Sequence, residues 1–370
     1  MRVAHYYARF LSHPSGVTDS IENWVRQARR AGHDAVVLCA PVPAPRELAA
    51  DVRGAVRTTP HVGRSRTTWV PRGLGRHVAP GDVLYLHEGW VASNVVAARQ
   101  GRRRGAVVAL MPHGVYETGI TSRLKDVAGI RRTVEAGVLR RVDWIHVFYP
   151  SEVELVDVVV RRLTAHAPSV LALPNGAPAP EDTVRWAGGG GYFLWMGRYD
   201  PDHKGIDHLL HRWSELPSPR PRLVLAGPDF RGGRGRTADL AADLGLGRDV
   251  EVRGSARGDD KERLIRECRA YLHPSRWESC SIMLLEMLAA GVPTLLSATI
   301  HAAEPLATQG VALAHDFGSP DGLDASLAAV DENHELGRSA RKWVAETATW
   351  DRVGAAYGEW LARLDQGGAR

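Results

Sequence analysis

Two glutamates eight positions apart, Glu278 and Glu286, are the residues of this chain best suited to chemistry. We expect Glu278 in a loop after a short buried strand, and Glu286 about two turns along the helix that follows. A carboxylate accepts hydrogen bonds from vicinal hydroxyl groups, which both a ribose and a hexose present. The backbone N–H groups of residues 279–283 would point out of a helix N-terminus, where phosphate and sugar oxygens bind. An isolated pair of this kind is more often two surface glutamates on one helix face.

Two cations follow a predicted strand at residues 192–196. Arg198 and Lys204 could neutralise the charge that grows on a departing nucleoside diphosphate, a task otherwise performed by a metal ion. The chain contains only four lysines, so one at this position is informative. The alternative for Arg198 is an ordinary surface ion pair.

A histidine and several glycines lie at other strand ends. His113 follows the predicted strand 106–110 and precedes a glycine. A lone histidine at such a place is as readily structural as functional. Gly16, Gly197, Gly227 and Gly254 would let the backbone approach a ligand closely.

These residues need a scaffold, and short apolar runs alternating with amphipathic stretches predict one. Buried strands are expected at 1–7, 35–39, 83–87, 106–110 and 144–148, with an amphipathic helix at 19–30. A second series is expected at 192–196, 222–226, 250–252, 270–273 and 294–297. The pattern predicts two doubly wound α/β domains with a ligand cleft at the carboxyl ends of their strands.

Composition narrows the function classes. Of 370 residues, 44% are hydrophobic and 24% charged, and no apolar run of transmembrane length occurs. The N-terminus lacks the pattern of a signal peptide. Three cysteines without a CxxC pair indicate neither zinc nor structural disulfides.

The positive charge of the chain is concentrated in its first half. Residues 1–176 carry a formal charge of +10 and the remainder −5, which indicates either an anionic partner for the first part or a solvated arginine-rich surface. Arg131, Arg132, Arg140 and Arg141 could likewise form a membrane-binding helix, although a solvated face is preferred.

The motifs together resemble the retaining GT-B glycosyltransferases of family 4. Glu-x7-Glu stands between a Pro-Ser-xx-Glu turn and an Ala-xx-Gly-x-Pro-Thr stretch, and a Gly-Arg…Lys-Gly element precedes it. Ser15-Gly16-Val17-Thr18 occupies the place of the family's Gly-Gly-Val loop, with Ser15 replacing the first glycine. The resemblance covers most of the chain and implies two facing Rossmann-like domains with a donor cleft between them. It implies an acceptor-side domain at 1–176, a nucleotide-sugar domain at 177–345, and a C-terminal helix at 346–370 that crosses back to the first domain.

The resemblance also implies roles for individual residues. Arg198 and Lys204 would hold the donor diphosphate, His113 would face the reacting sugar, Glu278 would bind a sugar hydroxyl and Glu286 the ribose. The implied catalytic residues are His113, Arg198, Lys204 and Glu278. The implied donor-binding residues are Gly16, Gly197, Gly227, Arg253, Gly254, Ser279, Cys280, Ser281, Ile282, Met283, Leu284 and Glu286.

The expected reaction is transfer of a hexose-type sugar, with retention of configuration, from a nucleoside diphosphate sugar to an acceptor hydroxyl. A UDP-sugar is favoured as donor, with GDP- and dTDP-sugars as alternatives; the acceptor could be a small metabolite, a glycan or a lipid-linked sugar. No metal, other cofactor or nucleic acid is expected, and the sequence contains no His/Cys cluster. A bacterial cytoplasmic protein, with contact at the inner membrane face as an alternative, fits the composition. A nucleotide-sugar epimerase or hydrolase and a non-catalytic nucleotide-sugar-binding protein are the rival functions, whereas the missing GxGxxG argues against a dinucleotide-dependent dehydrogenase.

Overall fold

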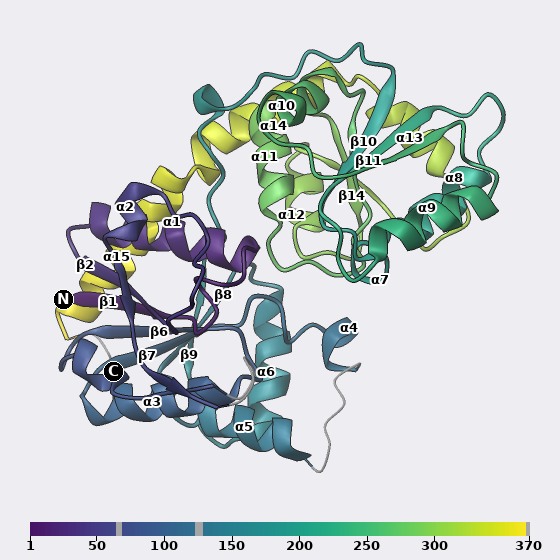
Figure 1. The fold of residues 1–370 in the computed structure, drawn as a ribbon. Helices are drawn as coiled ribbons and strands as arrows, with labels where there is room; N and C mark the ends of the chain where they lie inside the picture. Colours follow the sequence, from purple (N-terminus) through teal and green to yellow (C-terminus); the bar gives the residue numbers. More distant parts are fainter. Residues whose placement is uncertain (64–68, 123–128, 368–370) are drawn as a thin grey trace. The chain divides into compact units, whose positions relative to one another are not determined.

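The chain folds into two compact units, which the computed structural model describes for residues 1–63, 69–122 and 129–367 (Figure 1). The N-terminal unit comprises residues 1–175 together with the C-terminal segment 350–370, and the C-terminal unit comprises residues 176–349. Each unit is an α/β structure built on its own parallel sheet, which confirms the predicted fold class of two Rossmann-like domains.

The N-terminal unit contains a seven-stranded parallel sheet in the order β3-β2-β1-β6-β7-β8-β9. Its strands are short, buried runs rich in valine, leucine and alanine, as is typical of a sheet covered on both faces. Their bounds are β1 (Arg2–Tyr6), β2 (Asp34–Cys39), β3 (Val56–Thr58), β6 (Val83–His87), β7 (Val107–Met111), β8 (Trp144–Val147) and β9 (Ser169–Ala172). The predicted strands of this half are therefore confirmed.

Helices and short connecting elements complete the N-terminal unit. They are α1 (Gly16–Arg30), α2 (Ala50–Arg53), α3 (Ala92–Arg103), α4 (Thr118–Thr121), α5 (Ile130–Leu139), α6 (Glu152–Leu163) and the 3-10 helix η1 (Leu74–His77), with a small antiparallel pair β4 (His61–Val62) and β5 (Val70–Pro71). The prediction that residues 15–18 form a loop was wrong. Ser15 is the N-cap of α1, and its backbone N–H donates to Thr18 Oγ1 at 2.9 Å, so the helix begins at Gly16.

The last helix of the chain, α15 (Trp350–Asp365), packs against α1 of the N-terminal unit. Trp24 of α1 meets Trp350 and Tyr357 edge to face, with ring centroids 5.2 and 4.8 Å apart. The Trp24 indole N–H donates to Asn175 Oδ1 at 3.1 Å, at the end of the unit's first segment. Aromatic packing thus holds the two ends of the chain in one core.

The C-terminal unit contains a six-stranded parallel sheet in the order β12-β11-β10-β13-β14-β15. Its strands are β10 (Tyr192–Met196), β11 (Arg222–Ala226), β12 (Val250–Arg253), β13 (Tyr271–His273), β14 (Thr294–Ser297) and β15 (Leu313–His315). Its helices are α7 (Pro201–Lys204), α8 (Ile206–Ser214), α9 (Gly233–Asp243), α10 (Gly258–Glu267), α11 (Ile282–Ala290), α12 (Ala303–Thr308), α13 (Leu323–Val330) and α14 (His334–Trp343), with the 3-10 helix η3 (Pro180–Asp182) and the π-helix η4 (Val344–Ala348). The predicted strands of this half are also confirmed, whereas β15 was not predicted from the sequence.

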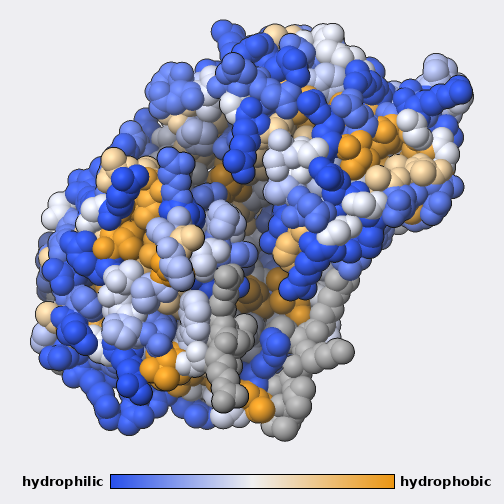
Figure 2. Space-filling view, viewed as in Figure 1, coloured by the Kyte–Doolittle hydropathy of each residue, from blue (hydrophilic) through white to orange (hydrophobic). Residues whose placement is uncertain are grey.

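The surface is mainly hydrophilic. Charged and polar residues cover most of the face shown in Figure 2, and hydrophobic residues form small separate areas on it. Among the described residues, the exposed large hydrophobic side chains are Val62, Ile130 and Val158. None of the described helices combines the length and the apolar character needed to span a bilayer. The predicted basic helix corresponds to α5, and its Arg131 and Arg132 are exposed.

Candidate functional site

The first of the two predicted glutamates lies in an ion pair. Glu278 is in the loop between β13 and α11, and its Oε2 accepts a hydrogen bond from Lys204 Nζ. Ser275 Oγ donates to the same oxygen at 3.4 Å, and His273 Nε2 lies 3.8 Å from it. The side chains of Lys204 and Glu278 are only 15% and 14% exposed. The structure therefore brings together two of the residues that were proposed for the donor site.

The electrostatic surroundings keep Glu278 ionised. Burial by itself would raise the pKa of this carboxyl, but the charge of Lys204, with smaller contributions from His203 and His273, lowers the pKa to about 2. Burial has the opposite consequence for the histidines, because it disfavours their charged form and lowers the pKa of each to about 4. Near neutral pH the cluster therefore contains one carboxylate, one ammonium group and two neutral imidazoles.

The loop after β13 is fixed to the segment after β10. Arg276 forms two hydrogen bonds with the Asp207 carboxylate, at 2.8 and 2.6 Å. The Trp277 ring stacks on His203 with centroids 5.0 Å apart, and His203 Nε2 donates to the Trp277 carbonyl at 3.0 Å. Gly205 has a φ of +63°, and a Cβ there would lie 2.0 Å from the Pro274 carbonyl oxygen, so only glycine permits this approach. These contacts position Lys204 against Glu278.

Arg198 lies on the same β10 loop, with its charge held by an aromatic ring. Its guanidinium carbon is 4.2 Å from the centroid of Phe230, and its Nη2 lies 3.4 Å from Asp200 Oδ2. The side chain is 39% exposed. Its Nε is buried and has no hydrogen-bond partner within the described ranges. The exposed part of the guanidinium could donate to a ligand.

The glycines at the ends of β10 and β11 allow their backbones to meet. A Cβ on Gly227 would lie 1.7 Å from the Gly197 carbonyl oxygen. Gly227 N–H donates to the Gly254 carbonyl at 3.1 Å, which links the end of β11 to that of β12. Arg253, at the end of β12, donates through Nη2 to both Asp260 oxygens at 3.1 and 3.2 Å. The predicted glycines therefore align three neighbouring strand ends.

The second glutamate lies on α11, as predicted. Glu286 Oε2 accepts a hydrogen bond from Lys261 Nζ at 2.6 Å, and the two side chains are 28% and 30% exposed. Ser279 and Cys280 lie in the preceding loop, and Ile282 and Met283 belong to the first turn of α11. Ser281 is the N-cap, and its Oγ accepts from the Leu284 N–H at 3.3 Å. That amide already has a partner, so the other amides of the first turn are the better candidates for binding an anion.

In the N-terminal unit, His113 follows β7 in a strained conformation. Its φ is +55°, a region that non-glycine residues seldom adopt and that often occurs at functional sites. His113 Nε2 is 2.9 Å from His87 Nδ1 at the end of β6, which is the neighbouring strand. Gly16 belongs to the same unit, at the start of α1. His113 and Gly16 therefore lie in the N-terminal unit, whereas the other predicted site residues lie in the C-terminal unit.

Sequence reasoning missed several residues at the strand ends of the N-terminal unit. Arg9 Nη2 pairs with Glu88 Oε2 at 2.5 Å, and the Tyr7 hydroxyl donates to Glu88 Oε1 at 3.2 Å. Glu88 also has a positive φ, of 62°. The available signal was position, because Tyr7 ends the predicted strand 1–7 and Glu88 directly follows the predicted strand 83–87. His203 and Asp207 were missed in the C-terminal unit, where the signal was their proximity in sequence to Lys204.

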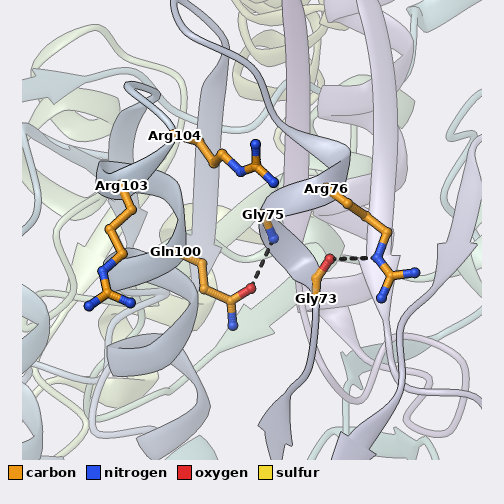
Figure 3. A pocket seen from close by; sticks show the side chains of 6 residues that line it. All are labelled: Gly73, Gly75, Arg76, Gln100, Arg103 and Arg104. Carbon is orange, nitrogen blue, oxygen red and sulfur yellow. Dashed lines mark hydrogen bonds between the residues drawn. The ribbon is translucent and has the colours of Figure 1, made fainter.

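A shallow pocket of about 470 Å³ lies elsewhere on the N-terminal unit (Figure 3). It lies between η1 and the end of α3, elements that precede β6 and β7, and is therefore at the amino edge of the sheet. In Figure 3, Gln100 Oε1 accepts from the Gly75 N–H at 2.9 Å, and Arg76 Nε donates to the Gly73 carbonyl at 3.0 Å. Arg103 and Arg104 complete its lining. None of the predicted site residues lines this pocket.

Comparison with known proteins places the cluster around Glu278 within a recognised domain. Residues 182–347 match the family model described as Glycosyl transferases group 1. The matched residues lie within the C-terminal unit. This domain contains Arg198, Lys204, Glu278 and Glu286.

Two curated proteins are similar in sequence. A phosphatidyl-myo-inositol mannosyltransferase of Mycolicibacterium smegmatis is 26% identical over 344 residues, which cover 87% of this chain and 83% of that protein. An uncharacterized glycosyltransferase of Methanocaldococcus jannaschii is 27% identical over 165 residues, but the match spans only 42% of that protein.

Solved structures share the fold over nearly the whole chain. Sucrose-phosphate synthase from Thermosynechococcus elongatus has a TM-score of 0.77 at 17% identity, with 99% of both chains covered. Anabaena HepE, in a complex with UDP and glucose, has a TM-score of 0.74 at 14% identity, with 98% of this chain and 99% of that chain covered. These neighbours have the GT-B fold. Together with the domain match, they support a glycosyltransferase of the GT-B type.

Proposed function

We propose that this protein transfers a hexose-type sugar from a nucleoside diphosphate sugar to an acceptor hydroxyl, with retention of anomeric configuration. The observation that carries the proposal is the paired Lys204 and Glu278 within the glycosyl transferases group 1 domain. One fixed cation and one fixed carboxylate at adjacent strand ends match the two parts of such a donor, its diphosphate and its sugar hydroxyls.

The two cations of the β10 loop are suited to the leaving group. As the bond to the sugar breaks, negative charge grows on the diphosphate, and Lys204 and Arg198 would stabilise it there. The Arg198 side chain is 39% exposed, so its guanidinium could reach a phosphate oxygen. The amides of the first turn of α11 would bind further phosphate oxygens.

The two glutamates are suited to hydroxyl groups. The low pKa of Glu278, about 2, means that this carboxylate is ionised near neutral pH and can only accept hydrogen bonds. We therefore assign it to a sugar hydroxyl, and Glu286 to the ribose. A carboxylate with a pKa of about 2 is too weak a base to take the proton of the acceptor hydroxyl, so that proton would pass to the departing phosphate instead.

The comparisons give more support for the class of sugar donor than for the identity of the acceptor. The HepE structure is described as a complex with UDP and glucose, which makes a UDP-sugar the first candidate, with GDP- and dTDP-sugars as alternatives. The similar mycobacterial protein is described as a phosphatidyl-myo-inositol mannosyltransferase, so lipid-linked acceptors belong in the screen beside glycans and small metabolites. No metal is required by the proposed chemistry, because Arg198 and Lys204 supply the positive charge.

A thermal-shift screen tests the donor assignment directly. A ligand at 100 times its Kd stabilises the folded protein by about 2.7 kcal/mol, which is readable as a shift of the Tm. We expect one nucleoside diphosphate among UDP, GDP, dTDP and CDP, together with its sugar conjugate, to stabilise the chain. NAD is included as a negative control, and a response to NAD alone would refute the proposal.

Matched arginine variants then test the role of the charge. Arg198→Ala should lower the kcat/KM of transfer by about 100-fold or more, the usual effect of removing a preorganised charge ligand. Arg338→Ala removes an exposed arginine that pairs with Glu335 on α14 and should leave kcat/KM unchanged. Equal activities of the two variants would contradict the assignment of Arg198.

Product analysis separates the proposal from its rivals. A transferase forms a glycosylated acceptor whose anomeric configuration, read by proton NMR, matches that of the donor. An epimerase or hydrolase would instead convert the donor or release free sugar without an acceptor. A non-catalytic nucleotide-sugar-binding protein would show the thermal shift and no turnover.

A further inference from the structure

Three histidine rings form a continuous hydrogen-bonded row across the N-terminal sheet. His5 lies on β1, His87 ends β6, and His113 follows β7, and these strands are neighbours in the sheet. His5 Nδ1 is 3.0 Å from His87 Nε2, and His87 Nδ1 is 2.9 Å from His113 Nε2. His5 and His87 are almost fully buried, at 0% and 1% exposure, whereas His113 is half-buried. The row therefore leads from the core to the carboxyl edge of the sheet.

All three rings are neutral near pH 7. Burial, with a smaller contribution from neighbouring histidines, lowers the pKa of His5 and of His113 to about 3. Burial likewise lowers the pKa of His87 well below its usual value. A neutral imidazole has one N–H donor and one acceptor nitrogen. Because each of the two hydrogen bonds needs a single proton, the row has only two arrangements: all three protons on Nδ1, or all three on Nε2.

The inner end of the row decides between these arrangements. His5 Nε2 is buried and has no hydrogen-bond partner within the described residues. With the protons on Nε2, this nitrogen would be a buried N–H without an acceptor, the kind of defect that folded proteins avoid most strongly. With the protons on Nδ1, it is only an unused acceptor. The row therefore favours Nδ1–H on every ring, so that His5 donates to His87 and His87 donates to His113.

We propose that His5 and His87 are positioning residues that hold His113 as its Nδ1–H tautomer and so present one N–H donor to an oxygen of the bound sugar substrate. This inference rests on the proposed transferase function for the identity of the oxygen, but not for the tautomer itself. Within the described part of the chain, the hydrogen bond that His113 makes is through Nε2, which leaves Nδ1 for a ligand. A hydroxyl or ring oxygen carries no full negative charge, so it is suited to a neutral N–H donor rather than to a cation.

The backbone conformation at His113 indicates that the surrounding structure holds this residue in place. Its φ of +55° is strained for a histidine, and the next residue, Gly114, has a φ of +74°. The Glu88 N–H donates to the Met111 carbonyl at 3.0 Å, which fixes the ends of β6 and β7 relative to each other. Strain of this kind persists only where the surroundings enforce it.

A second buried histidine of the same sheet provides an internal standard. His146 Nε2 faces the Leu173 carbonyl at 2.8 Å, and a carbonyl can only accept, so His146 must be the Nε2–H tautomer. Its Nδ1 is 3.3 Å from the Tyr85 hydroxyl, which can donate to it. His61 is the opposite standard, because its Nδ1 faces the Thr59 carbonyl at 2.7 Å.

Tautomers are read directly by NMR of protein labelled with 15N at the histidine ring. Long-range 1H–15N correlations distinguish Nδ1–H from Nε2–H, and single substitutions assign the signals. We expect His5, His87 and His113 to match the His61 standard and to differ from His146. A spectrum in which His113 is mainly Nε2–H would overturn the inference, whether or not the protein transfers sugar.

Substitution of the middle ring tests the coupling. His87→Phe keeps a planar ring but removes both nitrogens, so the Nδ1–H preference of His113 should fall by about tenfold or more, to a mixture of tautomers. The same variant should raise the KM for the sugar substrate more than it lowers kcat, because a fraction of the molecules no longer presents the His113 Nδ1–H group to that substrate. His146→Phe removes an equally buried histidine outside the row, and it should leave the His113 tautomer unchanged. An unchanged His113 signal in His87→Phe, or an equal change in His146→Phe, would show that the row does not set the tautomer.

Discussion

Removing the charge of Lys204 should destabilise the C-terminal unit through Glu278. The carboxyl of Glu278 has a pKa of about 2 in the folded protein against 4.5 for an unperturbed glutamate. These values differ by about 2.5, and at 1.36 kcal/mol for each pH unit the difference corresponds to about 3 kcal/mol. Lys204 is the main cause that lowers the pKa, with His203 and His273 contributing less. We therefore expect Lys204→Met, which keeps the apolar stem, to cost about 2–3 kcal/mol at pH 7.

The sign of the pH dependence follows from the direction of the pKa change. Because the pKa of Glu278 is lower in the folded state, the unfolded chain binds more protons between pH 4.5 and 2. The stabilisation from this group is therefore fully present above pH 4.5 and is lost as the pH falls toward 2. Between pH 5 and 8, this carboxylate should contribute a constant amount in the wild type.

A double-mutant cycle with Glu278→Gln isolates the pair. Since the chain has two units, the free energy of opening is best measured by hydrogen exchange at amides of β10 and β13, which report on the C-terminal unit alone. We expect a coupling energy of about 2–3 kcal/mol at pH 7 for Lys204 and Glu278.

The chain contains a matched control with the same chemistry. Lys261 and Glu286 also form a lysine–glutamate pair, at 2.6 Å, but their side chains are about twice as exposed. Solvent screening should reduce their coupling energy to below about 1 kcal/mol. If the two cycles give equal coupling energies, or if the Lys204 cycle gives less than about 0.5 kcal/mol, burial does not strengthen the Glu278 pair and our reasoning fails.

Two further predictions concern stability in each unit. Gly227→Ala should cost about 1–3 kcal/mol and lower the Tm, because its Cβ would lie 1.7 Å from a backbone oxygen, whereas Gly247→Ala, with open space around the new Cβ, should change stability by less than about 0.5 kcal/mol. Burial raises the pKa of Glu135 to about 7, although hydrogen bonds from Tyr116 and Trp90 act in the opposite direction. The folded state therefore binds more protons than the unfolded state between pH 4.5 and 7. The free energy of unfolding should fall by about 3 kcal/mol as the pH rises through that range. Glu135→Gln should abolish this loss in urea titrations at pH 5 and pH 8, and an unchanged pH dependence would rule out Glu135 as its source.

Much of the fold could be predicted because its strands are short, apolar and separated by clear turn signals. Runs such as 83–87 and 222–226 are almost fully buried, and burial on both faces leaves a continuous hydrophobic pattern in the sequence. The start of α1 was misplaced because Ser15 and Gly16 are as typical of a loop as of a helix N-terminus. Capping depends on one hydrogen bond that the residue types alone do not determine.

The candidate site could be predicted only one residue at a time. Lys204 and Glu278 were each assigned to a different part of a ligand, and nothing in a separation of 74 residues shows that they bond to each other. The histidine row is harder still, since His5 and His87 are 82 residues apart and meet only through the register of parallel strands. Contacts across strands depend on strand order, which the amphipathic pattern does not encode.

The ion pairs at the two glutamates give a consistent account of how a site for an anionic sugar donor can exist without its ligand. Two of the chain's four lysines pair with the two glutamates of the motif, one with each. A carboxylate at 14% exposure would be costly without a partner, and so would a buried ammonium group. If Lys204 binds a diphosphate, as we propose, Glu278 loses its main partner and needs new donors, which the hydroxyls of a sugar supply. A nucleoside diphosphate alone satisfies the lysine and leaves the carboxylate unpaired, whereas a nucleoside diphosphate sugar satisfies both. The pairing therefore favours the complete donor over its leaving group, and that is the direction a transferase needs in order to release its product.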